Sequence, residues 1–108
     1  MFPTTTPLPD GQRVRVRLPQ RADRARLEAL CARLGLEADE VLLARTLRFD
    51  PRRGLTLVAT CLVDRTEEIL GVATMDRYAD DPDLVLAVSP HVREVLSESL
   101  ALYARRTA

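Results

Sequence analysis

The stretch that decides the fold lies at residues 88–100, which read VSPHVREVLSESL. An uncharged strand at residues 84–88 leads into it, and Ser89 offers a hydroxyl that can cap the amides of a following helix. Pro90 suits the first helical position, because its ring fixes a helical φ and its missing N–H would have no partner there. From residue 92 onward the apolar side chains recur at helical spacing. The segment therefore predicts a strand that leads directly into an amphipathic helix.

The segment from Arg13 to Leu18 alternates strictly between arginine and an apolar residue. This period of two predicts a strand with Val14, Val16 and Leu18 on its buried face and three arginines on the other face. A ladder of arginines can follow a chain of phosphates. In a chain whose net charge is zero, however, the solvated face of an outer strand is the better interpretation.

Two helices are expected after this strand. Apolar residues at helical spacing predict the first over residues 22–34, and Gly35 is the expected C-terminal cap. The second is expected over residues 38–47, where acidic residues gather at the N-terminal end and arginines at the C-terminal end, as the helix macrodipole favours. The core residues expected on the first helix are Leu27, Leu30, Cys31 and Leu34.

Two further strands are expected in the middle of the chain. Residues 55–63 carry apolar groups on both alternating faces, which predicts a central strand covered on both sides. A polar hairpin loop is expected at residues 64–68. The next strand, residues 69–75, contains Gly71, which indicates a bulge or a close backbone contact.

The resulting order is β-α-α-β-β-β-α, with antiparallel links between the middle strands. This order predicts the α+β class, in which an antiparallel sheet is covered by helices. A chain of 108 residues with 46% apolar residues suffices for one core, so we expect a single domain over residues 13–108. Residues 1–12, with three of the seven prolines, are expected to form a flexible lead-in that adds little to the core.

Charge and composition narrow the classes of function. Sixteen basic residues balance sixteen acidic ones, which disfavours nucleic-acid binding. The sequence has no apolar run of membrane-spanning length, and residues 1–10 lack the layout of a signal peptide, so we expect a cytoplasmic protein without membrane contact. Cys31 and Cys61 lack CxxC spacing and are predicted to be buried thiols, with a disulfide between them left open as an alternative.

The sequence assigns neither a catalytic residue nor a metal site. His91 lies in the first turn of the last helix with no serine, cysteine or second histidine placed to form a relay, so a surface residue is favoured over a general base. Tyr78, Tyr103 and Asp76 carry weak signals, and no role is assigned to them. The run Asp80-Asp81-Pro82-Asp83 is interpreted as a solvated turn, since the proline interrupts the oxygen spacing of a calcium loop.

The order of elements, with a strand that leads through Val-x-Pro into a helix, resembles the first half of the GCN5-related N-acetyltransferase superfamily over residues 13–106. In that family the backbone amides of a glycine-rich motif wrap the pyrophosphate of acetyl-CoA at a helix N-terminus. The matching residues here are 93–98, of which Arg93 alone fits the motif. Glu94, Leu96 and Glu98 stand where the family has small residues, and the two carboxylates would repel the ligand.

The resemblance implies a truncated acyl-CoA N-acyltransferase-like fold, because the family continues with a fifth strand and further elements. We expect an acetyltransferase-like domain that has lost acetyl-CoA binding, uses no cofactor and acts through protein–protein contacts. The alternative is an active acyl-CoA-dependent N-acyltransferase with an atypical cofactor site, or one completed by another chain. In that alternative, acetyl-CoA would be bound by Val88, Ser89 and Arg93.

A truncated sheet of this kind would end at residues 84–88 with unpaired amides and carbonyls. An uncharged edge strand favours association, so we expect a homodimer through the Leu84–Val88 edge, with Leu102 and Tyr103 of the last helix also at the two-fold contact. The alternative is that residues 1–10 fold back over this edge. A different protein partner also stays open.

Overall fold

The computed structural model describes residues 3–37, 40–47, 52, 54–76 and 81–107. In this part of the chain, five strands form one antiparallel sheet in the order β1-β2-β3-β4-β5. The elements are β1 (Thr4–Pro7), β2 (Arg13–Arg17), the short 3₁₀ helix η1 (Arg21–Asp23), α1 (Arg24–Arg33), α2 (Glu40–Leu47), β3 (Gly54–Val63), β4 (Thr66–Asp76), β5 (Leu84–Ala87) and α3 (Pro90–Thr107). None of the described helices is both long and apolar enough to cross a bilayer.

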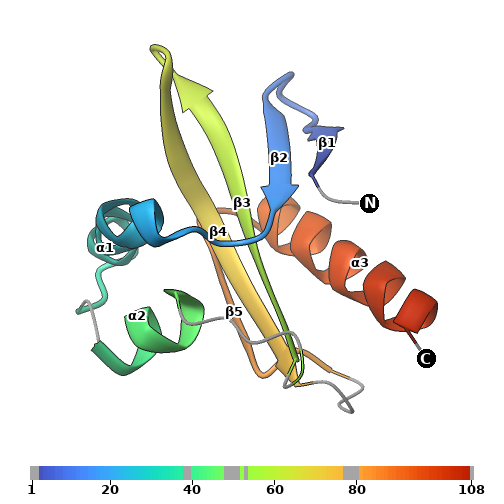
Figure 1. The fold of residues 1–108 in the computed structure, drawn as a ribbon. Helices are drawn as coiled ribbons and strands as arrows, with labels where there is room; N and C mark the ends of the chain where they lie inside the picture. The colour runs from blue at the N-terminus through green and yellow to red at the C-terminus, as the bar shows by residue number, and fades with distance from the viewer. Residues whose placement is uncertain (1–2, 38–39, 48–51, 53, 77–80, 108) are drawn as a thin grey trace.

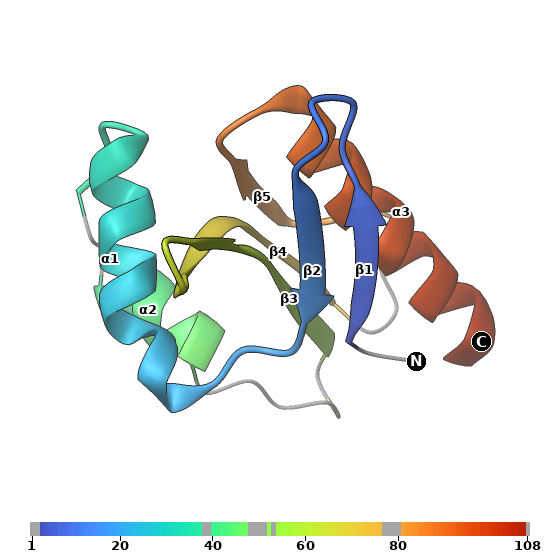
Figure 2. The same ribbon diagram turned by 90° about the horizontal axis from the view of Figure 1, so that it is seen from above.

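Helices cover both faces of the sheet, as Figure 2 shows with α1 and α2 on one side and α3 on the other. On the first face, Leu27 of α1 and Leu43 of α2 pack in one cluster with Val58 and Val72 of the central strands. On the second face, α3 packs on the sheet through four buried side chains. These are Val92, Val95, Leu96 and Leu100. The predicted α+β class, an antiparallel sheet covered by helices, is confirmed.

The long hairpin of β3 and β4 forms the centre of the sheet (Figure 1). Residues 55–61 and 69–75 are buried without interruption, because each strand has a helical layer on both faces. The predicted central strand is therefore confirmed. The apolar content of both alternating faces was its signal, since a strand with one solvated face would alternate with polar residues.

Gly71 lies at an irregularity in this hairpin, where the register shifts between Ala59 and Thr60 of the partner strand. A Cβ at Gly71 would lie 2.7 Å from Leu86 O and 2.9 Å from Leu96 Cδ1, so a side chain has no room there. The bulge or close contact that Gly71 predicts is confirmed. The glycine lets α3 and β5 approach β4 closely at one point.

The predicted helices are present with small shifts of their ends. The expected helix over residues 22–34 is divided into η1 and α1, and Gly35 ends it with a φ of 72°. Leu36 N–H donates to Cys31 O at 2.8 Å, which closes the last turn. The helix expected over residues 38–47 begins in the structure at Glu40, and residues 38–39 lie outside the described part.

Two expectations about strand ends are wrong. The expected loop at residues 64–68 is only two residues long, Asp64 and Arg65, and β4 already begins at Thr66. Both turn residues have positive φ, 51° and 67°, as in a type I′ hairpin turn. Leu18, expected on the buried face of the first strand, is 40% exposed because β2 ends at Arg17.

The N-terminal segment contributes a strand that the sequence did not predict. Thr4–Pro7 pairs with β2, and Leu8 is buried in the cluster beneath α3. Leu8 N–H donates to Gln12 O at 2.7 Å around the turn, where Gly11 has a φ of 87°. The described order is thus β-β-α-α-β-β-β-α, with one strand added before the expected series.

Candidate functional site

The junction between β5 and α3 holds two of the residues expected at a cofactor site. Val88 N–H donates to Leu70 O at 3.0 Å, so the pairing with β4 continues one residue beyond β5. Ser89 Oγ accepts a hydrogen bond from the Val92 N–H at 3.3 Å. This is the N-cap that the sequence predicts, and Pro90 follows it as the first residue of α3.

The segment that matches the pyrophosphate motif, residues 93–98, lies inside α3. Its backbone amides bond within the helix, beginning with the Arg93 N–H, which donates to Ser89 O at 3.1 Å. Glu94 and Glu98 are exposed, whereas Leu96 is fully buried against the sheet. The segment therefore presents an acidic helix surface, and its amides do not line a loop.

Arg93 lies apart from the other two expected cofactor residues. Its Nη2 donates to Val85 O at 3.3 Å, so the side chain lies along the β5 edge. Val88 and Ser89 line a hollow of about 400 Å³, and Arg93 is not among the residues that line it. Of the three residues expected at a cofactor site, the structure thus places Val88 and Ser89 at one hollow and Arg93 away from it.

The hollow has an apolar floor and a charged rim. Cys61, Leu70 and Val92 line its floor. Its rim carries Arg33 and His91 but also Asp10 and Glu68, so side chains of both signs are mixed there. Sequence reasoning pointed to His91 at the start of α3 but not to the other three side chains, which come from a turn, from α1 and from β4.

The remaining candidate residues do not form a catalytic or metal-binding group among the described residues. His91 is exposed, and no cluster of three histidine, cysteine or acidic side chains suits a metal ion there. Asp83 Oδ1 accepts a hydrogen bond from Thr74 Oγ1 at 2.6 Å, which ties the turn before β5 to β4. Asp80 and Tyr78 lie outside the described residues, as does the side chain of Tyr103.

The two cysteines are free and buried, as the sequence predicts. Cys31 belongs to α1, and Cys61 belongs to β3 in the cluster beneath α3. Burial raises the pKa of both thiols, since the uncharged form is favoured away from water. Neither cysteine therefore has the lowered pKa that marks a reactive thiolate.

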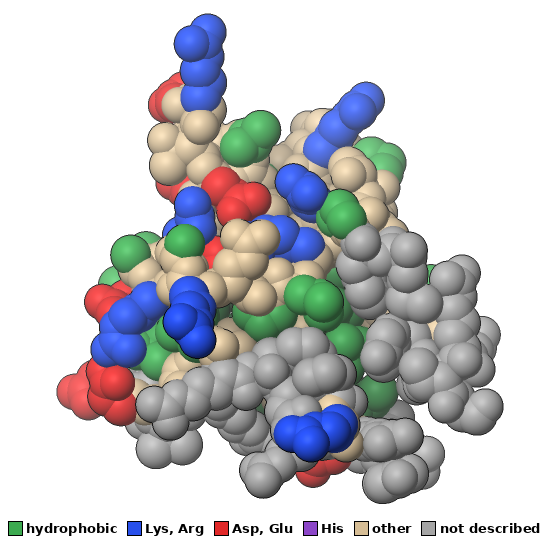
Figure 3. All heavy atoms as spheres, viewed as in Figure 1, with side chains coloured by type: hydrophobic (Ala, Val, Ile, Leu, Met, Phe, Trp, Pro, Cys, Tyr) green, Lys and Arg blue, Asp and Glu red, His purple; other side chains and the backbone are tan. Residues whose placement is uncertain are grey.

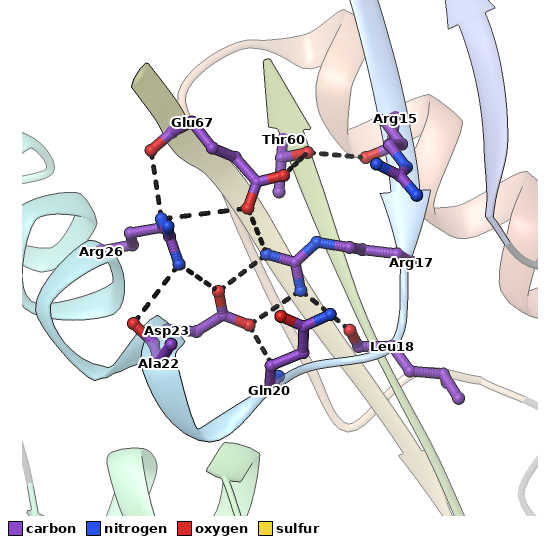
Figure 4. Close-up of polar contacts among 9 residues, drawn as sticks. All are labelled: Arg15, Arg17, Leu18, Gln20, Ala22, Asp23, Arg26, Thr60 and Glu67. Atoms are coloured by element: carbon purple, nitrogen blue, oxygen red, sulfur yellow. Dashed lines mark hydrogen bonds and ion pairs between the residues drawn. The ribbon is translucent and has the colours of Figure 1, made fainter. Parts of the chain in front are cut away.

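The densest polar arrangement lies elsewhere, between the sheet and α1 (Figure 4). Arg17 at the end of β2 donates two hydrogen bonds to Asp23, from Nη1 at 2.9 Å and from Nη2 at 2.7 Å. Its Nη2 also donates to Glu67 Oε1 at 2.6 Å. The side chain of Arg17 is 7% exposed and that of Asp23 is fully buried, so this is an ion pair shielded from water.

Arg26 of α1 completes an ion network that consists of Arg17, Asp23, Arg26 and Glu67. We call it the buried ion network after its buried pair, Arg17 and Asp23, since Arg26 and Glu67 are half-buried. Arg26 Nη1 donates to Asp23 Oδ1 at 3.1 Å, and its Nε donates to Glu67 O at 3.2 Å. Asp23 Oδ2 accepts a further hydrogen bond from the Gln20 N–H at 2.7 Å. The network therefore fastens β2, η1, α1 and β4 to one another.

The protonation of the network follows from these contacts. Burial alone would raise the pKa of Asp23, but hydrogen bonds from Arg17, Gln20 and Arg26 lower it below its usual value. The hydrogen bond from Arg17 likewise lowers the pKa of Glu67. The lowered pKa makes each carboxylate a weak base, and arginine donors bond its oxygens, so we interpret the network as structural.

The arginine ladder of β2 is thus only partly solvated. Arg13 and Arg15 are exposed as expected, whereas the expectation of a solvated side chain is wrong for Arg17. Asp23, six residues after Arg17, was the local signal that could have suggested a pair. The other acceptor, Glu67, is fifty residues away, and no local pattern connects it to β2.

The face shown in Figure 3 carries arginines and acidic side chains interspersed, with no broad area of one sign among the described residues.

The comparisons with known proteins add no identity: neither a family model, nor a curated protein, nor a solved structure matches this chain.

Proposed function

We propose that this chain is an acetyltransferase-like domain that does not bind acetyl-CoA and acts through protein–protein contacts. The proposal combines the resemblance in the order of elements with one structural observation. Residues 93–98, which occupy the place of the pyrophosphate-binding motif, lie within α3 and bond their amides inside the helix. Phosphate recognition at a helix start needs amides that are free to point at the anion.

The first turn of α3 offers few backbone amides that are free to point at a phosphate. Pro90 has no N–H, and the Val92 N–H donates to Ser89 Oγ, which leaves the His91 amide. About one and two turns further on, Glu94 and Glu98 expose carboxylates that repel a pyrophosphate. Both features oppose the binding of a polyanion at this helix start.

Calorimetric titration with acetyl-CoA tests the proposal. We expect no saturable heat. We also expect an unchanged melting temperature, because acetyl-CoA would raise it only by binding the folded state. The matched control is the double variant Glu94→Gln, Glu98→Gln, which removes the charges but keeps the helix. It should also fail to bind, since the amides stay bonded. Saturable binding to the native chain would overturn the proposal.

A second candidate, an active acyl-CoA-dependent N-acyltransferase with an atypical site, is favoured by the hollow next to Val88 and Ser89. A cofactor seated there would place its phosphates near Arg33 on the rim. This candidate predicts acetyl-CoA binding that Arg33→Ala weakens at least tenfold and that Arg13→Ala, a change on exposed β2 surface, leaves unchanged. Absence of binding to the native chain removes it.

For the compartment we propose the cytoplasm. The free thiols of Cys31 and Cys61 are compatible with a reducing environment, in which unpaired cysteines persist. Alkylation of the protein during cell lysis tests this, since both thiols should be recovered in reduced form.

A further inference from the structure

The two edges of the sheet differ in how well they resist pairing with another strand. At one edge, β1 contains Pro7, which has no N–H, and Pro3 and Pro9 flank the strand. At the other edge, β5 consists of Leu84, Val85, Leu86 and Ala87, with neither a proline nor a charge. Natural edge strands are commonly protected by proline or charge, so β5 is the edge open to pairing.

The hydrogen-bond pattern shows which groups of β5 point outward. Val88 N–H donates to Leu70 of β4, and β4 pairs with β5 in the register Val72↔Leu86. Because hydrogen-bonding direction alternates along an antiparallel strand, Leu86 bonds inward like Val88, and the backbone groups of Val85 and Ala87 point away from β4. Arg93 confirms this direction, since its guanidinium reaches the Val85 carbonyl from outside the sheet.

We infer that two copies of this chain pair through β5, antiparallel about a two-fold axis at Leu86. This inference rests on the proposed function, because it names the partner in the protein contact. In this register, Val85 of one copy faces Ala87 of the second, and both are outward-bonding residues. The two residue pairs then exchange four backbone hydrogen bonds, and the two sheets become one continuous sheet.

A second copy fits this edge for reasons visible in the strand itself. All four side chains of β5 are uncharged, so self-pairing brings no like charges together. All four are also half-buried, and a neighbouring strand would cover them further. The alternative in which residues 1–10 cover this edge is wrong for Thr4–Pro7, which pair with β2 at the opposite edge of the sheet.

Two side chains of α3, Arg93 and Leu102, bear on what pairing through β5 requires and which surface it buries. Arg93 must release the Val85 carbonyl before pairing, which costs one exposed hydrogen bond of 3.3 Å. Leu102, expected at the contact from the sequence, follows nine residues later, which is about two and a half turns at about 3.6 residues per turn. It therefore lies on the opposite side of α3 from Arg93, and pairing in this register does not bring it into the contact. The side chain of Tyr103 lies outside the described part.

The mass of the native chain in solution tests the inference. Light scattering at micromolar concentration should give about twice the 12.1 kDa mass of one chain. Ala87→Pro removes an outward N–H and no bond to β4, so it should give a folded monomer, whereas Ala87→Ser should stay dimeric. A native chain at 12.1 kDa, or a folded Ala87→Pro variant that remains a dimer, would overturn the inference.

The register has its own test, which also decides the matter if Ala87→Pro does not fold. Leu86→Cys places two thiols opposite each other at the two-fold axis, so mild oxidation should link two chains. Leu84→Cys, the control, faces Val88 of the other copy and should link poorly. Equal linkage by both variants contradicts the register. Titration of the same samples with acetyl-CoA tests the proposed function separately. The mass of the protein reports on pairing through β5, whereas the heat of binding reports on acetyl-CoA.

Discussion

Among single residues, Gly71 matters because its lack of a side chain lets α3 pack closely on the sheet at this position. The nearest atom to a methyl group added at this position would be the backbone oxygen of Leu86, and backbone cannot move aside as a flexible side chain can. Gly71→Ala should therefore destabilise the fold by roughly 1–3 kcal/mol, the usual cost of overpacking. The midpoint of urea unfolding measures this.

A second substitution separates the possible causes of that loss. Trimming Val92, whose Cγ1 would lie 3.0 Å from the added methyl group, should not restore stability in the double variant Gly71→Ala, Val92→Ala. Recovery in the double variant would show that the clash is with the side chain of α3 and not with the backbone of β5.

Thr46 of α2 has a different defect. Its hydroxyl is buried, and its Oγ1 has no hydrogen-bond partner in the described structure. Valine has nearly the same shape without the polar group, so Thr46→Val should leave stability equal or raise it by up to about 1 kcal/mol. Thermal unfolding measures the change.

Thr74→Val provides the matched control for that prediction. Thr74 Oγ1 donates to Asp83 Oδ1 at 2.6 Å, so its loss should lower stability by roughly 0.5–1.5 kcal/mol. If both valine variants were equally destabilised, the hydroxyl of Thr46 would have a partner that the structure does not show.

At the scale of elements, the buried ion network holds α1 and β2 against β4. The pKa values of Asp23 and Glu67 are lowered from ordinary values of 3.8 and 4.5, so the unfolded chain binds protons more readily than the folded one. The stabilisation is therefore complete above about pH 4.5 and is lost as the pH falls through the lower folded values. Urea titrations from pH 7 to pH 3 should show this loss.

Glu67→Gln isolates the contribution of the network to that pH dependence. It should lower stability at pH 7 by roughly 1–3 kcal/mol, because hydrogen bonds to charged groups are among the stronger ones, and it should make the acid limb less steep. Glu28→Gln removes an acidic group that pairs with Arg24 on exposed surface, and it should change neither. An unchanged acid limb in Glu67→Gln would assign the acid sensitivity to other carboxylates.

The elements also show what the sequence could predict. Helical and alternating periodicity located α1, α3 and β2, because burial of a repeated face dictates those patterns. The apolar content of both faces located β3, because that strand is covered on both sides. The strand β1 was missed since three prolines and three threonines carry no apolar alternation, and the tight turn at Asp64 and Arg65 lacks the glycine or asparagine that usually marks it. Likewise, the partnership of Arg17 with Glu67 depends on the tertiary fold, which no local pattern encodes.

At the scale of the whole molecule, a single sheet carries the cores of both faces. Leu57 and Ala59 of β3 point to the cluster beneath α3, and Val58 between them points to the cluster beneath α1 and α2. Neighbouring residues on the same strands thus belong to different layers. Because both helical layers pack on the same strands, loss of the sheet would expose both cores at once. We therefore expect the whole molecule to unfold in one cooperative step.

The two buried thiols allow that cooperativity to be measured from inside. Cys31 reports on α1 and Cys61 on the cluster beneath α3, and their raised pKa values make both slow to react while folded. In the single-thiol variants Cys31→Ala and Cys61→Ala, labelling of the remaining thiol should begin at urea midpoints that match each variant's loss of circular dichroism. Labelling of Cys31 well before that transition would show that α1 detaches alone, with the buried ion network too weak to couple it to the sheet.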